Sequence, residues 1–84
     1  MKPIRLSQHA REQLAYRGTD AEEILNTIRS IPWQPAERGR LECRKDFPFQ
    51  QNWNGIFYKT KQVRPIFAEE RNEIVVVTVY VYYF

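Results

Sequence analysis

The sequence has few of the residues that crosslink a chain or bind a metal: one cysteine, Cys43, and one histidine, His9. A single cysteine excludes an internal disulfide. One cysteine and one histidine cannot supply the ligands of a zinc site without added carboxylates. A Gly-rich phosphate loop and the G-x-S-x-G and C-x-x-C motifs are also missing. We therefore expect neither a metal nor a cofactor.

Long apolar segments are missing as well. The N-terminal residues lack the apolar region of a signal peptide. The apolar run at residues 74–84 has 11 residues, whereas a membrane-spanning helix needs about 20. The lone cysteine fits a reducing compartment. The sequence thus predicts a cytoplasmic protein without a membrane partner.

The composition is that of one small globular domain, residues 1–84, with 43% hydrophobic and 27% charged residues. The formal net charge is +3. Most of the excess lies in residues 32–72, which carry eight basic and five acidic side chains. A positive balance of this kind is compatible with a phosphate-bearing partner.

The last stretch, residues 73–84, reads EIVVVTVYVYYF and is typical of a strand, since branched and aromatic side chains fit a pleated sheet. Side chains alternate along a strand. We expect one face to be aliphatic and to lie under helices, and the other to turn toward a cleft or a partner. The first face holds Val75, Val77, Val79 and Val81, and the second holds Ile74, Val76, Thr78, Tyr80 and Tyr82.

Two helices are predicted near the N-terminus, over residues 7–17 and 20–30. Ser7 is a good N-cap for the first helix, and Gly18 a natural terminator. Thr19 opens the second helix in a T-x-x-E capping box, and Pro32 ends it. The short link between them predicts an αα-hairpin.

The rest of the chain predicts strands at residues 40–47, 56–60 and 63–69, with an aromatic loop at 47–54 and Pro65 marking an edge strand or a bulge. The expected fold class is α+β: an N-terminal αα-hairpin packed on one face of a twisted antiparallel sheet of three to four strands. The expected helix core consists of Leu6, Ala10, Leu14, Ile24, Leu25 and Ile28.

His9 is a candidate for acid–base chemistry, because histidine can take and return a proton near neutral pH. Gln13 and Tyr16 lie near the same helix face. Arg17 is the better candidate for a cationic helper on this helix, because Arg11 points away from His9. The alternative is that His9 is a surface or half-buried histidine that only holds a hydrogen bond.

Basic and aromatic residues are interleaved on the predicted strands. Metal-independent RNA cleavage needs an acceptor for the 2′-hydroxyl proton, an acid for the leaving oxygen and cations for the phosphorane charge. His, Tyr, Lys and Arg can supply all three, and aromatic rings can stack on unpaired bases. The alternative is that the aromatics form the core and the cations a solvated face. The catalytic candidates are His9, Arg17 and Tyr80, and the RNA- or phosphate-binding candidates are Arg44, Lys59, Lys61 and Arg64.

The segment LSQHAREQLAYRGTDAEEI resembles the opening of a small bacterial and phage domain of unknown function. That family has a Leu/Thr-Ser/Thr-x-His-Ala-x-x-x-Met/Leu-x-x-Arg-Gly pattern followed by an acidic helix. EIVVVTVY resembles its terminal strand, so the likeness covers nearly the whole chain. The family is in turn similar to the RelE/ParE/BrnT toxin superfamily. The positions that match are His9, Arg17 and Thr78.

The resemblance implies a toxin of a toxin–antitoxin system that acts on RNA, including ribosome-associated mRNA, and binds a cognate antitoxin protein. The leading hypothesis is a metal-independent endoribonuclease. A second is a non-catalytic binding domain, directed at gyrase as in related ParE proteins or at nucleic acid. A third is a structural protein that forms a homodimer through an unpaired terminal strand.

Overall fold

The computed structural model describes all 84 residues. A short strand is followed by two helices and then by five further strands, with one 3₁₀ turn, η1, among them. The elements are β1 (Ile4–Leu6), α1 (Gln8–Arg17), α2 (Ala21–Ser30), β2 (Gln34–Pro35), η1 (Glu37–Gly39), β3 (Leu41–Glu42), β4 (Lys45–Trp53), β5 (Ile56–Glu69) and β6 (Ile74–Tyr83).

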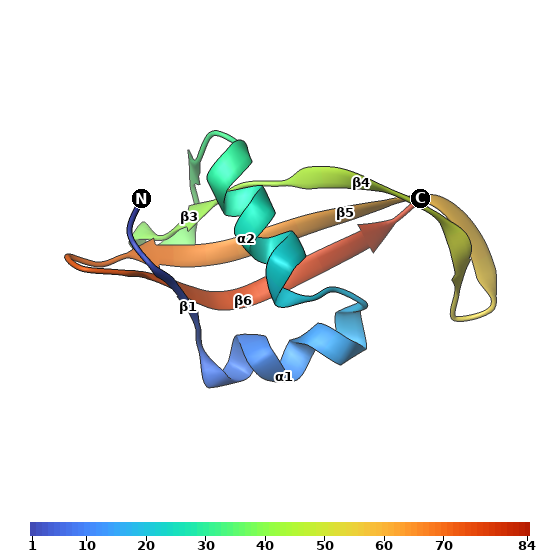
Figure 1. Ribbon diagram of the computed structural model, residues 1–84, viewed down its shortest axis with the longest axis horizontal. Helices are drawn as coiled ribbons and strands as arrows, with labels where there is room; N and C mark the ends of the chain where they lie inside the picture. Colours follow the sequence, from blue (N-terminus) through green and yellow to red (C-terminus); the bar gives the residue numbers. More distant parts are fainter.

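All six strands belong to one mixed sheet (Figure 1). β6 lies between β1, which runs parallel to it, and β5, which runs antiparallel. The other side of β5 pairs with β3 and β4, and β2 pairs with β3. The class is α+β, but the expected antiparallel sheet of three to four strands is wrong. The sequence predicts a loop at residues 47–54, but nearly all of them belong to β4. The segment before α1 forms β1, which adds a parallel strand.

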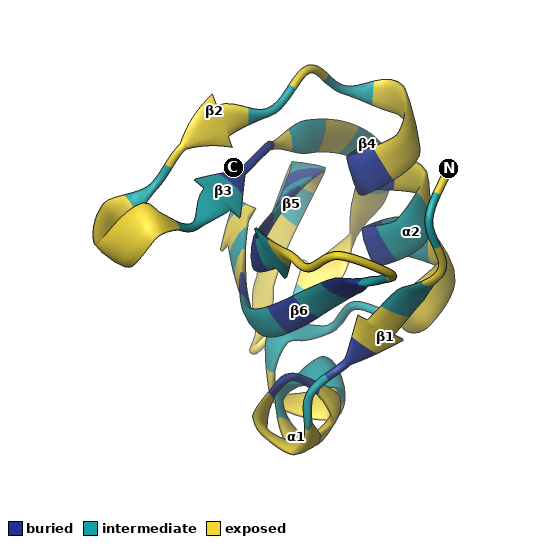
Figure 2. Ribbon diagram, turned by 90° about the vertical axis from the view of Figure 1, so that its left-hand side faces the viewer, coloured by how far each residue is buried: buried dark blue, intermediate teal, exposed yellow.

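The two helices have their main contacts with different strands, α1 with β6 and α2 with β5. In Figure 1, α2 crosses in front of the sheet, whereas α1 lies below β6 at the edge of the sheet. The expected αα-hairpin packed on one sheet face is therefore wrong. The physical reason is the polarity of α1: its only buried residue is Ala10, and Figure 2 shows its outer surface exposed. Such a helix has too little apolar surface to pair with another helix.

Capping residues set the ends of both helices. Ser7 is the N-cap of α1 and Gly18 ends it in the left-handed conformation, as predicted. The capping box that begins at Thr19 is wrong, because the N-cap of α2 is Asp20, whose carboxylate accepts a hydrogen bond from the Glu23 N–H at 2.8 Å. The hydroxyl of Thr19 donates to the Glu23 carboxylate instead.

A bulge in β6 decides which side chains face the core. Ile66 on β5 pairs with Thr78, but the next residue, Phe67, pairs with Val76, so Val77 is an extra residue. An extra residue of this kind bends the strand and changes the phase of its side-chain alternation. The two halves of β6 therefore point different sets of side chains at the core.

Before the bulge, the core side of β6 carries Ile74 and Val76, so the predicted core positions of Val75 and Val77 are wrong. After the bulge the prediction is confirmed, because Val79 is fully buried. The predicted helix residues are confirmed in the core or packed against it. The fully or largely buried core consists of Leu6, Ala10, Ile24, Ile28, Cys43, Val63, Phe67, Ile74, Val76 and Val79, with Leu14, Leu25 and Val81 among the partly buried residues around it.

Pro65 lies inside β5, which is neither an edge strand nor bulged at that residue, so both expectations for it are wrong. The neighbouring strand is interrupted there instead. β3 ends at Glu42 and β4 begins at Lys45, which leaves residues 43–44 out of the ladder opposite Pro65. A proline has no N–H to donate to a ladder, so this interruption accommodates it.

The lone thiol lies in the interruption between β3 and β4. Cys43 is buried, and its Sγ is 3.6 Å from the carbonyl oxygen of Thr27 on α2. Burial raises the pKa of this thiol to about 11. A buried thiol with a raised pKa has little thiolate at neutral pH and is chemically inert.

A second cluster, made of aromatic rings, lies at the end of the sheet where β6 ends. Tyr83 stacks on Trp53 with ring centroids 5.1 Å apart and an interplanar angle of 17°. It also contacts the rings of Phe49 and Tyr58. Its hydroxyl donates a hydrogen bond to the carbonyl of Arg17 at 2.5 Å. The C-terminal end of α1 is thereby fixed to the end of β6.

The turn between the helices gives a test of this packing. Gly18 and Gly39 have similar positive φ angles, 74° and 72°. Alanine at either position would adopt an unfavourable left-handed conformation that costs about 1–2 kcal/mol. Only at Gly18 would the added Cβ also collide with Trp53 and Tyr83, whereas nothing lies within 4 Å at Gly39. We expect Gly18→Ala to lower the free energy of unfolding by about 1–3 kcal/mol more than Gly39→Ala, measured by urea denaturation. Equal losses would show that the rings do not press on the turn.

Candidate functional site

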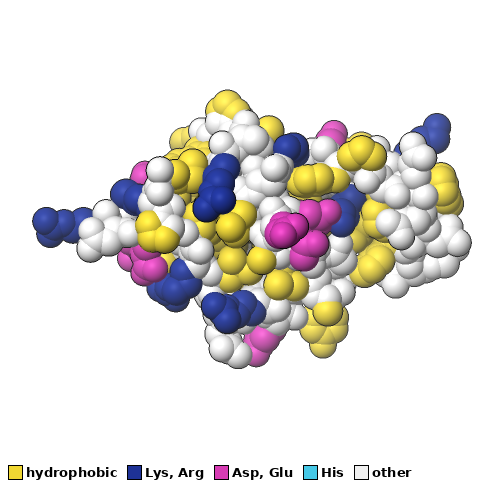
Figure 3. Space-filling view, in the orientation of Figure 1, with side chains coloured by type: hydrophobic (Ala, Val, Ile, Leu, Met, Phe, Trp, Pro, Cys, Tyr) yellow, Lys and Arg dark blue, Asp and Glu magenta, His cyan; other side chains and the backbone are white.

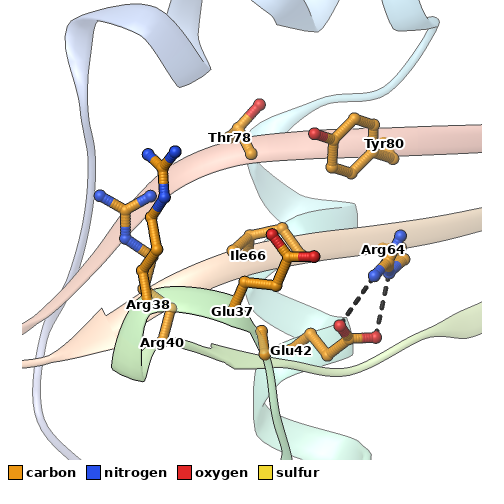
Figure 4. Close-up of a pocket in the computed structure, with 9 residues that line it drawn as sticks. Glu37, Arg38, Arg40, Glu42, Arg64, Ile66, Thr78 and Tyr80 are labelled. Atoms are coloured by element: carbon orange, nitrogen blue, oxygen red, sulfur yellow. Dashed lines mark hydrogen bonds and ion pairs between the residues drawn. The ribbon is translucent and has the colours of Figure 1, made fainter.

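A pocket of about 440 Å³ lies on the sheet face opposite α2, between η1 and strands β5 and β6 (Figure 4). On the α2 face, seen in Figure 3, the Lys and Arg side chains are scattered among acidic and apolar ones. The pocket, by contrast, gathers three arginines and two glutamates. It is lined by Ala36, Glu37, Arg38, Arg40, Glu42, Arg64, Ile66, Thr78 and Tyr80.

An ion pair forms one side of this pocket. The Nε and Nη2 atoms of Arg64 lie 3.0 and 2.8 Å from the two carboxylate oxygens of Glu42, which is buried. The hydrogen bonds from Arg64 hold the pKa of the Glu42 carboxyl below its usual range, although burial acts in the opposite direction. The same bonds raise the pKa of Arg64. Arg44, which is half exposed, contacts this carboxylate at 3.4 Å. The pair holds the guanidinium of Arg64 in one orientation.

Tyr80 lies next to two guanidinium groups. Its ring centroid is 5.6 Å from the Cζ of Arg17 and 5.5 Å from the Cζ of Arg64, within the range of a cation–π interaction. Arg64 also donates from Nη1 to the hydroxyl of Tyr82 at 3.2 Å. Both tyrosines remain more than a third exposed. Cations and an accessible aromatic ring therefore occur together on this face.

Gln13 places Arg17 beside this site. The Oε1 atom of Gln13 accepts hydrogen bonds from the Thr78 hydroxyl at 2.6 Å and from the Val79 N–H at 3.3 Å. These bonds dock α1 on the outer edge of β6. Because Arg17 follows Gln13 by four residues, it lies on nearly the same helix face, one turn further on. The guanidinium of Arg17 thus reaches the ring of Tyr80.

Two more arginines come from the η1 turn. Arg38 has a positive φ of 60°, which is uncommon for a residue other than glycine, and Gly39 follows at 72°. In Figure 4 the side chains of Arg38 and Arg40 extend from η1 toward β6. Neither guanidinium is paired with a carboxylate. Both cations are therefore available to a ligand.

Two of the predicted site residues, Arg64 and Tyr80, line this pocket. Arg17 is not among the lining residues but lies next to Tyr80. Arg44 reaches it only indirectly, through the carboxylate of Glu42. His9 is exposed on α1, outside the residues that line the pocket, and makes no side-chain hydrogen bond. It lies one helical turn before Gln13 on α1.

The other two predicted cations, Lys59 and Lys61, lie away from the pocket. Lys59 is exposed near the turn between β4 and β5. Lys61 is largely buried, with its Nζ 2.8 Å from the Glu23 carboxylate and 2.9 Å from the Gly18 carbonyl. Its charge therefore holds the inter-helix turn against the sheet.

The sequence-based prediction missed Glu37, Arg38, Arg40 and Glu42. The one available signal is Arg38-Gly39-Arg40, in which two cations flank a glycine, a residue typical of turns. Nothing in the local pattern shows that this turn folds back over β5 and β6. That placement depends on pairing between β3 and β5, about 25 residues apart in the sequence.

We define the arginine–tyrosine face as Arg17, Arg38, Arg40, Arg64 and Tyr80. Guanidinium groups bind phosphate in a bidentate manner and also stack on planar rings. Glu37 lines the same pocket, is exposed and has no ion-pair partner, so its carboxylate can accept a proton or a hydrogen bond. The face can bind an anion with planar groups attached and place an acceptor beside it.

Comparison of the chain with protein-family models, curated proteins and solved structures finds no match. The structure contains no group of three or more His, Cys, Asp or Glu side chains that could hold a metal ion. Neither helix is long and apolar enough to cross a lipid bilayer. The arginine–tyrosine face is therefore the feature of this protein that indicates a function.

The ion pair in the pocket predicts a pH dependence of stability. Because the folded-state pKa of Glu42 is lowered, its contribution is fully present above the unfolded-state pKa of about 4.3 and is lost as the pH falls through the lower folded-state value. We expect the parent protein to lose stability below about pH 5, and Glu42→Gln to show a shallower loss. The control is Glu73→Gln, which removes an exposed ion pair with Arg5. All the pH curves are measured in high salt, because salt screens that surface pair. Parallel pH curves for Glu42→Gln and the parent would contradict this role.

Proposed function

We propose that this chain is the toxin of a toxin–antitoxin system and cleaves RNA without a metal ion. The observation that carries the proposal is the arrangement of Arg17 and Arg64 around Tyr80, at a pocket that Arg38 and Arg40 also line. RNA presents a phosphate and planar bases together, which this combination of cations and an aromatic ring suits. The motif around His9 and Arg17 supports the same class of protein.

In the proposed reaction, the 2′-oxygen of a ribose attacks the adjacent phosphorus and the bond to the 5′-oxygen breaks. The products are a 2′,3′-cyclic phosphate and a 5′-hydroxyl. Glu37 accepts the proton of the 2′-hydroxyl, and Tyr80, or His9 on the exposed surface of α1, donates a proton to the leaving oxygen. The free arginines stabilise the charge that develops on the phosphorane. Lys61, whose charge is paired with Glu23, has no part in this scheme.

A second candidate function is nucleic-acid binding without cleavage. It is favoured by the position of His9, which lies outside the pocket lining. In this case the same arginines hold phosphates and no proton is transferred. Binding would be sensitive to salt, because cations that contact phosphates release counterions.

Two matched arginine variants test the proposed reaction. Arg17 and Arg29 each lie in the last turn of a helix, but only Arg17 contacts Tyr80. We expect the purified protein to cleave RNA in the presence of EDTA, leaving 2′,3′-cyclic phosphate ends. Arg17→Ala should lower the cleavage rate by about 100- to 1,000-fold, the range for losing one charge-stabilising group. Arg29→Ala should leave the rate unchanged.

The results separate the two candidate functions. If the RNA stays intact while salt-sensitive binding persists, the binding function is supported and the cleavage function is rejected. Absence of both would overturn both candidates. His9→Ala and Glu37→Gln then identify the acid–base groups, since a group that transfers a proton contributes about 100- to 10,000-fold to the rate.

The toxin assignment has its own test. Expression of the chain in bacterial cells should arrest growth, and co-expression of the neighbouring gene, as the source of an antitoxin, should restore it. Arg17→Ala should be far less toxic at equal protein level. Unimpaired growth of cells that produce the folded parent protein would contradict the toxin assignment, whatever the result with purified RNA.

A further inference from the structure

Three aromatic side chains form a row along the outer face of β6, and the pocket accounts for only one of them. Tyr80, Tyr82 and Phe84 alternate with core-side residues and are 37%, 41% and 58% exposed. Phe84 follows β6 directly, and its backbone still pairs with Thr60 through two hydrogen bonds. We call Tyr80, Tyr82 and Phe84 the aromatic row. Large exposed apolar side chains that gather in this way mark interaction sites.

The bulge at Val77 creates the row. By shifting the phase of β6, it leaves Val79 on the core side and all three rings on the face that carries the pocket. Arg64 connects the pocket with the row, since it lies near the ring of Tyr80 and donates to the hydroxyl of Tyr82. The row therefore continues the arginine–tyrosine face away from the pocket.

The spacing of the row fits separated bases. Side chains at alternate positions of a strand are about 6.8 Å apart, twice the rise of about 3.4 Å per residue. Bases in a duplex are stacked about 3.4 Å apart, so each is covered by its neighbours and none can lie on a ring. In an unpaired strand the bases can splay apart and stack on aromatic side chains one by one.

From this we infer that the aromatic row is a base-stacking platform that makes the protein bind single-stranded RNA in preference to duplex, with about one nucleotide on each ring. The inference rests on the proposed function, and it names the substrate class of the same face. Charge complementarity supports RNA as the occupant, because Arg17 and Arg64 lie at the Tyr80 end of the row and can hold the phosphates that link the bases.

The experiment measures binding separately from cleavage. Fluorescence anisotropy is recorded with 2′-O-methyl oligonucleotides, which cannot undergo attack by a 2′-hydroxyl, as single strands of two to eight nucleotides and as duplexes. We expect the affinity to rise steeply up to about four nucleotides, and the duplex to bind at least about tenfold more weakly. Phe84→Ala and Tyr82→Ala should each weaken single-strand binding by about 5- to 100-fold, the range for one base–aromatic stack.

Two control variants keep the test specific. Phe57 has the same exposed fraction as Phe84, 58%, but lies by the turn between β4 and β5, so Phe57→Ala should bind like the parent. Tyr82→Phe keeps the ring and loses the hydroxyl that accepts from Arg64, so it should weaken single-strand binding much less than Tyr82→Ala. Urea denaturation of each variant identifies any loss of fold.

Each outcome supports or overturns the inference. Tight single-strand binding that depends on the row, in a protein that leaves RNA uncut, would support the platform and reject the nuclease. RNA cleavage with unchanged binding in folded Phe84→Ala and Tyr82→Ala would overturn the platform and leave the proposed function standing. Equal or tighter binding of the duplex, or no binding of any oligonucleotide, would also overturn the platform.

Discussion

The contact between Gln13 and the edge of β6 determines how the functional face is assembled. One amide oxygen accepts from the hydroxyl of Thr78 and the backbone N–H of Val79. The helix that carries Gln13 buries only Ala10, so apolar packing alone contributes little to its position. A buried donor left without a partner costs about 1–3 kcal/mol, so losing this polar contact would destabilise the docked position of α1 by a similar amount. Through it, a helix at the edge of the sheet brings its last cation, Arg17, to the ring of Tyr80.

Charge on this face is divided between structure and binding. Glu42 is held by Arg64, and this pair orients one guanidinium without leaving a buried charge unpaired. The three remaining arginines, Arg17, Arg38 and Arg40, have no carboxylate partner. Three unpaired cations therefore lie where an aromatic ring is also accessible. Elsewhere, as at Lys61 and Glu23, opposite charges hold elements of the fold together.

Features that depend on local chemistry were predictable from the sequence, and features that depend on distant pairing were not. The N-cap at Ser7 and the left-handed Gly18 follow from the residues themselves, as does the buried face of α2. The parallel pairing of β1 with β6 joins segments about 70 residues apart, and no local pattern contains it. The bulge at Val77 belongs to the same class, because an uninterrupted run of valines gives no sign of where the alternation changes phase.

The candidate site divides in the same way. Arg17 and Tyr80 could be proposed from residue type and expected position, and they do meet. Arg38 and Arg40 could not, because their place over the sheet is set by a turn with an unusual backbone conformation. Lys61 shows the converse difficulty: a cation on a strand looks free in the sequence, but the fold places a carboxylate 2.8 Å away.

The position of Cys43 makes this protein convenient for site-specific labelling. The chain has no other cysteine, and this one is enclosed beneath α2 with its pKa raised to about 11. A maleimide dye added to the native protein near neutral pH would find almost no thiolate. A cysteine introduced on the surface, for example at the turn between β4 and β5, would therefore carry the only fluorophore or spin label, with no need to remove the native residue.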